Sequence, residues 1–361
     1  MTTASPPVEA ATSTISTGAL ARVARSYVLR RLLRAVFVVW VVATGVFFLV
    51  RLLPGNPVDV YINTQIAMYG KTYQEAAASA STIFTFDPNT PILQQYLDYL
   101  VGLVQGDLGN SILSASTTVA EKIAVHLPWT LFSAGLAMII SIAVGLTVGM
   151  VMAYRRGGIV DHAVTALGSV LHAIPNYLMA ILFVVLLGVQ LQLFDFAQMR
   201  GHSTPGVQPS FSPSFFGDAL YHAALPIWVY VLTTVGTWSL VMKSSTTQVL
   251  DEDYVTVAKA RGLSNSRIAS AYVGRNAVLP MVAQIATQAA FVVGGAIFVE
   301  QTFGYDGIGI ELFQAVNARD YPVIQGILLV ITIVVVLANL VADLIYSVLD
   351  PRIRTDDRTE A

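Results

Sequence analysis

The chain has 361 residues, of which 55% are apolar and only 12% are charged. Soluble domains carry about 25% charged residues, so this composition indicates a membrane protein and excludes an ordinary soluble enzyme. The formal net charge of −2 gives no support for nucleic-acid binding. The lack of cysteine excludes disulfides, thiolate metal sites and thiol catalysis.

Residues 1–26 are rich in small and polar side chains, and we predict a disordered cytoplasmic tail there. Arginines then precede an apolar run that continues to Leu53 and ends at Pro54-Gly55. A cleaved signal peptide would have a shorter run and a small-residue cleavage site, so this run is predicted to be a retained span. At the other end of the chain, residues 350–361 are predicted to form a cytoplasmic tail.

Six apolar segments follow one another between residues 27 and 349, each with about 20 or more residues, enough to cross a hydrocarbon core of ~30 Å. They are Leu32–Leu53, Trp129–Tyr154, Asp161–Leu193, Leu220–Met242, Ala277–Val299 and Val323–Leu349. The third is too long for one straight span, and Pro175 interrupts it. Glycines at helical spacing in the second, Gly135, Gly145 and Gly149, predict close helix packing. The expected fold is therefore an all-α membrane protein with six transmembrane helices.

The distribution of Lys and Arg predicts the orientation. If the N-terminus is inside, fifteen of the twenty basic residues lie in the inner segments and the other five lie outside. Both termini are then cytoplasmic, with two long external segments at residues 54–127 and 194–221. In the first, Pro91 begins a predicted helix through Val104, and the sequence GDLGN ends it. The second is rich in Pro, Ser and Gly and is predicted to be a loop.

The inner segment 251–276 carries charge regularly and predicts a helix–Gly–helix unit. Asp253 at the start of the first helix and Lys259 near its end complement the helix dipole. Gly262 is expected at positive φ, and Ser264 is expected to cap the second short helix. The small residues Ala258 and Ala260 would let a partner surface approach closely. A solvated loop that merely joins two spans remains the alternative from chemistry alone.

Polar side chains inside predicted spans are candidates for function because they are costly in lipid. We single out one set in the fourth and fifth segments as a candidate pathway for a hydrophilic solute: Thr233, Thr234, Thr237, Gln284, Thr287 and Gln288. The alternative is that these groups form interhelical hydrogen bonds that hold the bundle together. Asn339 and Asp343 lie one helical turn apart in the last segment. For Asp343 we prefer the structural explanation, in which the side chain forms a bond that holds the bundle together.

The sequence contains no GxxxxGK[ST] phosphate loop, no HExxH and no GxSxG, and its five histidines have no ligand spacing. We therefore predict no catalytic residue, no metal site and no cofactor in this chain. Any energy source for transport is expected to come from another subunit.

Five stretches resemble the dipeptide and oligopeptide permeases of ABC importers, and together they cover most of residues 27–354. They are RRLLRAVFVVWVVATGVFFLVRLLPGNPV at 30–58, GDLGNSI at 106–112, GGAIFVEQTFGYDGIG at 294–309, ARDYPVIQG at 318–326 and LVADLIYSVLDPRIR at 340–354. The inner segment is similar to the family's ATPase-coupling motif, with Thr256-Val257 in place of the usual Glu-Ala. Residues 68–86 are Ala- and Ser-rich, where the family usually has a Leu- and charge-rich helix.

The resemblance implies the permease fold of type I ABC importers, in the bacterial inner membrane, forming a pathway for di- or oligopeptides. It also implies a second homologous permease subunit, two ATPases that bind ATP and Mg, and an extracytoplasmic peptide-binding protein. The residues expected to couple to the ATPases are Asp253, Tyr254, Thr256, Val257, Ala258, Ala260, Arg261, Gly262 and Leu263. Alternatives are a related permease for nickel complexes, haem or another solute, and, in another class, a stand-alone secondary transporter.

The Ala-rich stretch Met68–Phe86 is predicted to be a slender external loop that enters the opened cleft of the binding protein. Its candidate contact residues are Tyr69, Tyr73, Phe84 and Phe86. The alternative is an Ala-rich surface helix that covers the external mouth.

Overall fold

The computed structural model describes residues 27–52, 57–83, 90–112 and 117–349, and within these ranges every regular element is a helix. The predicted tails, 1–26 and 350–361, lie outside the described residues. The first half contains α2 (Tyr27–Leu52), α3 (Pro57–Tyr69), α4 (Tyr73–Ile83), α5 (Ile92–Gln105), α6 (Val119–Tyr154), α7 (Ile159–Ala173), α8 (Asn176–Leu182) and the π-helix η1 (Phe183–Gln190). The second half contains α9 (Pro213–Leu250), α10 (Asp253–Ala260), α11 (Asn265–Arg267), the π-helix η2 (Ile268–Gly274), α12 (Arg275–Ala277), α13 (Leu279–Phe303), α14 (Ile308–Ala318) and α15 (Tyr321–Leu349).

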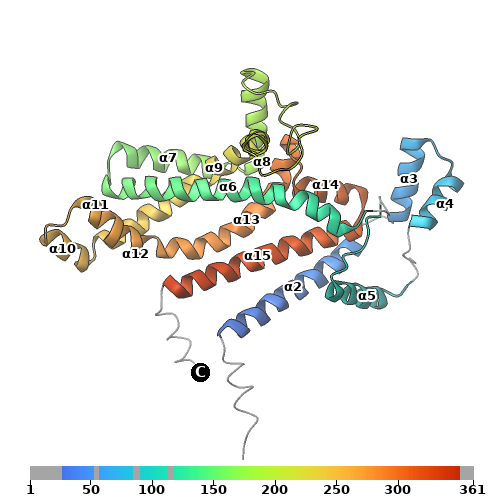
Figure 1. Ribbon diagram of the computed structural model, residues 1–361, viewed down its shortest axis with the longest axis horizontal. Helices are drawn as coiled ribbons and strands as arrows, with labels where there is room; N and C mark the ends of the chain where they lie inside the picture. Colours follow the sequence, from blue (N-terminus) through green and yellow to red (C-terminus); the bar gives the residue numbers. More distant parts are fainter. Residues whose placement is uncertain (1–26, 53–56, 84–89, 113–116, 350–361) are drawn as a thin grey trace, which may run out of the picture.

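The long helices α2, α6, α9, α13 and α15 run along the same general direction (Figure 1). Helix α6 packs along α9, α13 lies against α9 and α15, and α2 packs on α15. Among the described residues, four helices are long and apolar enough to cross a membrane, or five if the bent pair that includes α7 is one span. The prediction of a multi-span helical membrane protein is confirmed, whereas the count of six is not established by these spans.

Small residues allow the close packing at the centre of this bundle. A Cβ on Gly236 of α9 would lie 2.6 Å from the Cα of Gly168 in α7, so the two backbones touch. Glycines 145 and 149 of α6 pack in the same way against α9, which confirms the expected close approach at these positions. A Cβ on Gly135 would meet nothing within 4 Å, so this glycine does not contribute to the contact.

The third apolar segment is broken at the predicted place. Helix α7 ends at Ala173, and after Ile174-Pro175 the chain continues as α8 and η1 at an angle of 98° to it. Pro175 has no N–H to continue the hydrogen-bond ladder, and it disfavours helical φ and ψ at the residue before it. The bend leaves His172 of α7 and Asn176 of α8 beside polar residues of α9.

Two external boundaries differ from the prediction. Helix α6 already begins at Val119, where Thr118 and Glu121 form a capping box. Helix α9 begins at Pro213 after the N-cap Ser212, so residues 213–218 are helical and the prediction that the loop-like stretch continues to Asp218 is wrong there. A capping serine followed by proline at the first helical position is a strong start signal, which the Pro- and Ser-rich composition concealed.

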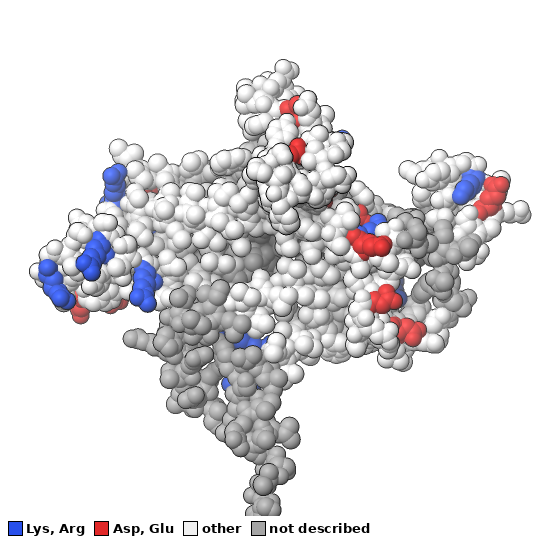
Figure 2. All heavy atoms as spheres, in the orientation of Figure 1, with Lys and Arg blue, Asp and Glu red and all other residues white. Residues whose placement is uncertain are grey.

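Charged residues are segregated along the long direction of the molecule. Figure 2 shows Lys and Arg over the end where α10–α12 lie, Asp and Glu mostly toward the end where α3, α4 and α5 lie, and largely uncharged surface between them. A wide uncharged belt between two charged ends is the surface that a membrane-spanning protein presents to lipid. The compact element α10–α12 and the external elements therefore lie at opposite ends of the bundle.

Candidate functional site

The compact element α10–α12 follows α9 in the chain, from Asp253, three residues after α9 ends at Leu250. Helix α10 has Glu252 as its N-cap residue and is followed by Arg261 and by Gly262, whose φ is +71°. The Ser264 hydroxyl accepts a hydrogen bond from the Arg267 backbone N–H at 3.4 Å. The predicted helix, the positive φ at the glycine and the serine cap are all confirmed, because each rests on short-range backbone preferences.

One face of α10 is buried against η2. Val255 and Ala258 are 0% and 2% exposed and pack in a cluster with Ile268 and Val273. The expectation that Ala258 faces a partner protein is therefore wrong. The small side chain of Ala258 lets α10 lie close to η2. The sequence of an eight-residue helix is too short to indicate which of its faces the next segment will cover.

The opposite face of α10 is exposed and combines polar groups with an apolar one. Val257 is 56% exposed and Tyr254 38% exposed, and Leu263 is partly buried in the same cluster as Val255. The other predicted coupling residues on this side are also exposed: Asp253, Thr256, Ala260, Arg261 and Gly262. An apolar side chain ringed by polar groups on a rigid helix is suited to contact another protein.

Polar bonds connect α10 to the long helices. The Asn276 side-chain amide donates to the Tyr254 hydroxyl at 3.0 Å, which links α12 to α10. The Ser245 hydroxyl of α9 donates to the Ala277 carbonyl at 2.7 Å, which links α9 to α12. These two bonds connect α10 to α12 and α12 to α9.

The candidate pathway residues are brought together only in part. A cavity of about 310 Å³ beside the bend is lined by His172, Ile174, Pro175, Asn176, Tyr230, Thr233, Thr234 and Gln288. Three of these were predicted: Thr233, Thr234 and Gln288. Thr237 lies outside the cavity lining, and its hydroxyl is 3.0 Å from Nδ1 of His172. Gln284 is partly buried elsewhere on α13, and the side chain of Thr287 lies outside the described residues, as does that of Asp343.

The hydroxyls in this cavity serve two purposes. Thr233 donates to the Val229 carbonyl of its own helix at 2.8 Å. Thr234 donates to the Ser141 hydroxyl of α6 at 2.9 Å, which is an interhelical hydrogen bond of the kind the alternative reading expected. The Tyr230 hydroxyl is buried and has no hydrogen-bond partner in the described part of the chain. The cavity is thus lined in part by hydroxyls that stabilise the bundle.

The sequence did not single out His172, Asn176 and Tyr230 as cavity residues. They come from α7, α8 and α9, and only the 98° bend places them around one space. Pro175 predicted the bend itself but neither its direction nor the helix that it would face.

The Ala-rich external stretch is helical rather than extended. Helices α3 and α4 form a hairpin that packs through Tyr61, Ile62, Ala76 and Ala80. The prediction of a slender extended loop is wrong there, because the alanines provide a close helix–helix contact. Tyr69 and Tyr73, near the turn, are 68% and 65% exposed. Phe84 and Phe86 lie outside the described residues.

The stretches that carried the family resemblance meet at the end of the bundle opposite α10–α12. The Ser111 hydroxyl and the Ile112 N–H, which follow GDLGN, both donate to the carboxylate of Asp320. The carboxylate of Glu300 accepts from the Thr130 hydroxyl of α6 and from the Gly309 N–H, at 2.7 Å, at the start of α14. Asp320 and Glu300 are 1% and 0% exposed. They therefore connect the segment before α6, α6 itself, α13 and α14 at this end of the bundle.

Long apolar helices, with a compact exposed element at one end of the bundle and buried carboxylates that connect loops at the other, are the architecture of a multi-pass membrane protein. Residues 145–355 match the family model described as binding-protein-dependent transport system inner membrane component. The chain belongs to this family and is a multi-pass protein of the bacterial inner membrane.

Relatives match nearly the whole chain. A protein named as a peptide permease of Brucella suis is 35% identical over 328 residues, which are 91% of this chain and 98% of the relative. The di/tripeptide transport system permease protein DppB of Pseudomonas aeruginosa is 31% identical over 91% of this chain and 98% of its own. The dipeptide transport system permease protein DppB of Escherichia coli K12 is 32% identical over 85% and 92%, respectively.

Proposed function

We propose that this chain is one of two membrane-spanning permease subunits of an ATP-driven importer of di- and oligopeptides. The observation that carries the proposal is the similarity, over 85–91% of the chain, to proteins named as peptide permeases. The chain would cross the membrane six times, with both termini in the cytoplasm, as in type I ABC importers. Its partners are a homologous permease, two ATPase subunits that bind ATP and Mg, and an external peptide-binding protein.

The exposed face of α10 is the docking surface for the ATPases. Helix α10 buries Val255 and Ala258 on its other face against η2, which makes the element compact. The hydrogen bonds of Asn276 and Ser245 connect this element to α12 and α9. ATP-driven closure of the ATPases displaces α10, and the displacement passes to the long helices α9 and α13. The chain performs no covalent chemistry, and ATP hydrolysis belongs to its partners.

The cavity at the bend is part of the route that cargo follows. Its lining mixes Thr, Gln, Asn and His groups with apolar ones, which suits the amide-rich backbone and variable side chains of a peptide. The α3–α4 hairpin, with its exposed tyrosines, is a contact for the binding protein at the external end.

Copurification followed by transport measurement tests this function. A tagged chain should copurify with a second permease and the ATPases, and the reconstituted complex should import radiolabelled trialanine only with the binding protein and ATP. Import of nickel complexes or haem but not of trialanine would reassign the cargo within the family. Import by this chain alone, without ATPases, would show a stand-alone transporter and overturn the proposal.

A further inference from the structure

A second pocket lies at the external end, away from the coupling element and from the cavity at the bend. It has a volume of about 670 Å³ and is formed by the external loop after η1, the first turns of α9 and the turn between α13 and α14. Its polar lining residues are Gln198, Arg200, Thr204, Tyr221 and Asp306. Pockets of 300–1,000 Å³ are the usual size for small-molecule ligands, and a few extended residues at ~3.3 Å each fit such a space.

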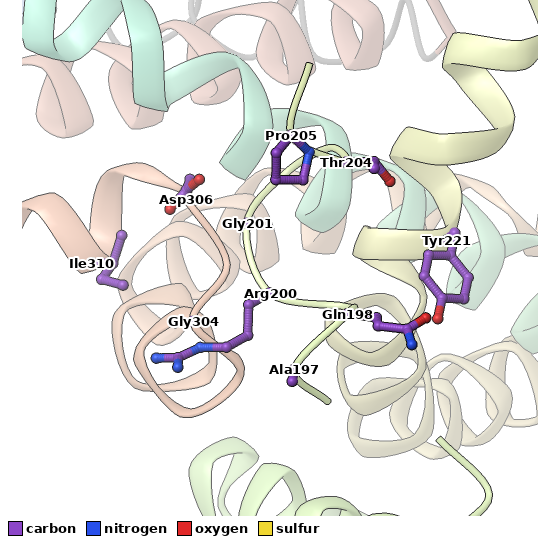
Figure 3. Close-up of a pocket in the computed structure, with 10 residues that line it drawn as sticks. All are labelled: Ala197, Gln198, Arg200, Gly201, Thr204, Pro205, Tyr221, Gly304, Asp306 and Ile310. Atoms are coloured by element: carbon purple, nitrogen blue, oxygen red, sulfur yellow. The ribbon is translucent and has the colours of Figure 1, made fainter. Parts of the chain in front are cut away.

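The two charged side chains of this pocket lie on one side of it. Figure 3 shows Arg200 and Asp306 on the side of Ile310, with Gln198 and Tyr221 on the other. One side therefore offers a cation and an anion, while the other offers neutral hydrogen-bonding groups. A short peptide carries the complementary set, since it has a carboxylate, an ammonium group and amides between them.

The backbone at Arg200 is hydrogen-bonded on both sides, which fixes the point from which its side chain extends. Its carbonyl lies 3.1 Å from Nδ1 of His222, and the following Gly201 donates its N–H to the Gly304 carbonyl at 2.8 Å. A Cβ on Gly304 would lie 2.8 Å from Nε of Arg200, so the guanidinium packs directly over this glycine.

The carboxylates near Arg200 already have other partners. Oδ2 of Asp306 is 3.2 Å from Nδ1 of His202, and Asp218 accepts from the N–H and the hydroxyl of Thr204. Within the described part of the chain, Arg200 forms no ion pair, and it is exposed to the pocket. Its planar fork of donors is therefore free for an added carboxylate, with which it matches in geometry.

Asp306 supplies a negative charge on the same side. Its side chain is 46% exposed despite the contact with His202. The hydrogen bond from His202 is the main reason that the pKa of Asp306 lies below its usual range, so this group is an anion at neutral pH. It can face the ammonium group of a ligand whose carboxylate lies on Arg200.

We propose that this pocket binds short peptides as they reach the permease, with Arg200 holding the terminal carboxylate and Asp306 facing the terminal ammonium. The proposal rests on the proposed function, because it takes the cargo to be a peptide, and it adds an external site that reads both ends of that cargo. The structural alternative is that Arg200 serves only to complement the carbonyl groups at the C-terminal end of α13.

Equilibrium binding to the complete complex in nanodiscs, without the binding protein, separates these roles. The probes are trialanine, its C-terminal amide and its N-acetyl derivative. The wild-type complex should prefer the acid to the amide by about tenfold, because a charge-assisted bidentate contact is lost in the amide. Arg200→Gln should weaken acid binding by about tenfold and abolish the preference, whereas Arg200→Lys should retain part of it. Asp306→Asn should reduce the preference for the free over the acetylated amine.

The control is Arg156→Gln, which removes the charge of an exposed arginine between α6 and α7, outside the pocket, and should leave all three affinities unchanged. An Arg200→Gln complex with the wild-type acid-to-amide ratio would overturn the proposal. If that variant kept the acid-to-amide ratio but lost docking of the binding protein, the proposal would also be overturned, because the guanidinium would then contact a protein partner instead of a peptide. Trialanine import by the wild type with its binding protein is measured alongside. If the wild type imports trialanine but Arg200→Gln leaves the acid-to-amide affinity ratio unchanged, only the pocket proposal fails. If the wild type imports no peptide, the proposed function itself fails.

Discussion

Gly262 follows α10 with a backbone conformation that residues other than glycine and asparagine rarely adopt. Its φ is +71°, and a Cβ built on it would meet nothing within 4 Å. Any effect of a substitution within the isolated chain therefore comes from backbone strain and not from collision. In the complex a second effect is expected, because the same residue lies on the exposed face proposed to contact the ATPase.

Two variants separate strain from obstruction. Gly262→Val places a β-branched residue at positive φ, which costs about 1–2 kcal/mol. A cost of that size changes the ratio of correctly folded to distorted turns by about fivefold to thirtyfold. Gly262→Asn adds a side chain of similar size but tolerates this conformation. If the backbone turn alone matters, the asparagine variant should resemble the wild type; if room for the ATPase matters, both variants should be impaired.

The assay is ATP hydrolysis stimulated by the peptide-loaded binding protein, together with peptide uptake in proteoliposomes. We expect Gly262→Val to assemble and to lose most of the stimulated hydrolysis and uptake. Arg261→Ala is the milder comparison, since an exposed ion pair contributes only about 0–1 kcal/mol. Wild-type stimulation and uptake in the valine variant would refute the idea that this turn transmits the ATPase movement.

Four further results are expected. Gly236→Leu should destabilise the complex by several kcal/mol in thermal unfolding, because its Cβ would meet the backbone of α7, whereas Gly135→Leu should have little effect; equal effects would contradict the packing argument. A single cysteine at Ser210 should react with an impermeant thiol reagent added to intact cells and one at Ser266 should not, and the reverse pattern would invert the topology. A cysteine at Thr233 should change its accessibility when nucleotide is added if the cavity opens during transport, and should not change if it only stabilises the bundle. Replacement of the α3–α4 hairpin by a Gly/Ser linker should weaken docking of the binding protein and with it uptake; unchanged docking and uptake would make the hairpin only a cover over the external mouth.

Features that depend on neighbouring residues were predictable from the sequence. The apolar segments, the helix at Ile92–Gln105 and the break at Pro175 follow from composition, periodicity and the missing proline N–H. Positive φ at Gly262 and the cap at Ser264 likewise depend on a few adjacent residues. The family resemblance also came from linear stretches, and the comparison with known relatives confirms it.

Features that depend on which surfaces meet needed the tertiary structure. Ala258 is buried because η2 folds back onto one face of α10, and nothing within the helix specifies that face. His172 and Asn176 join Thr233 around one cavity because the chain bends by 98° toward α9. Arg200 and Asp306, 106 positions apart in the printed numbering, share a pocket because two external turns are hydrogen-bonded through Gly201 and Gly304. Local preferences determine the helices, whereas contacts between distant segments determine which polar groups share a site.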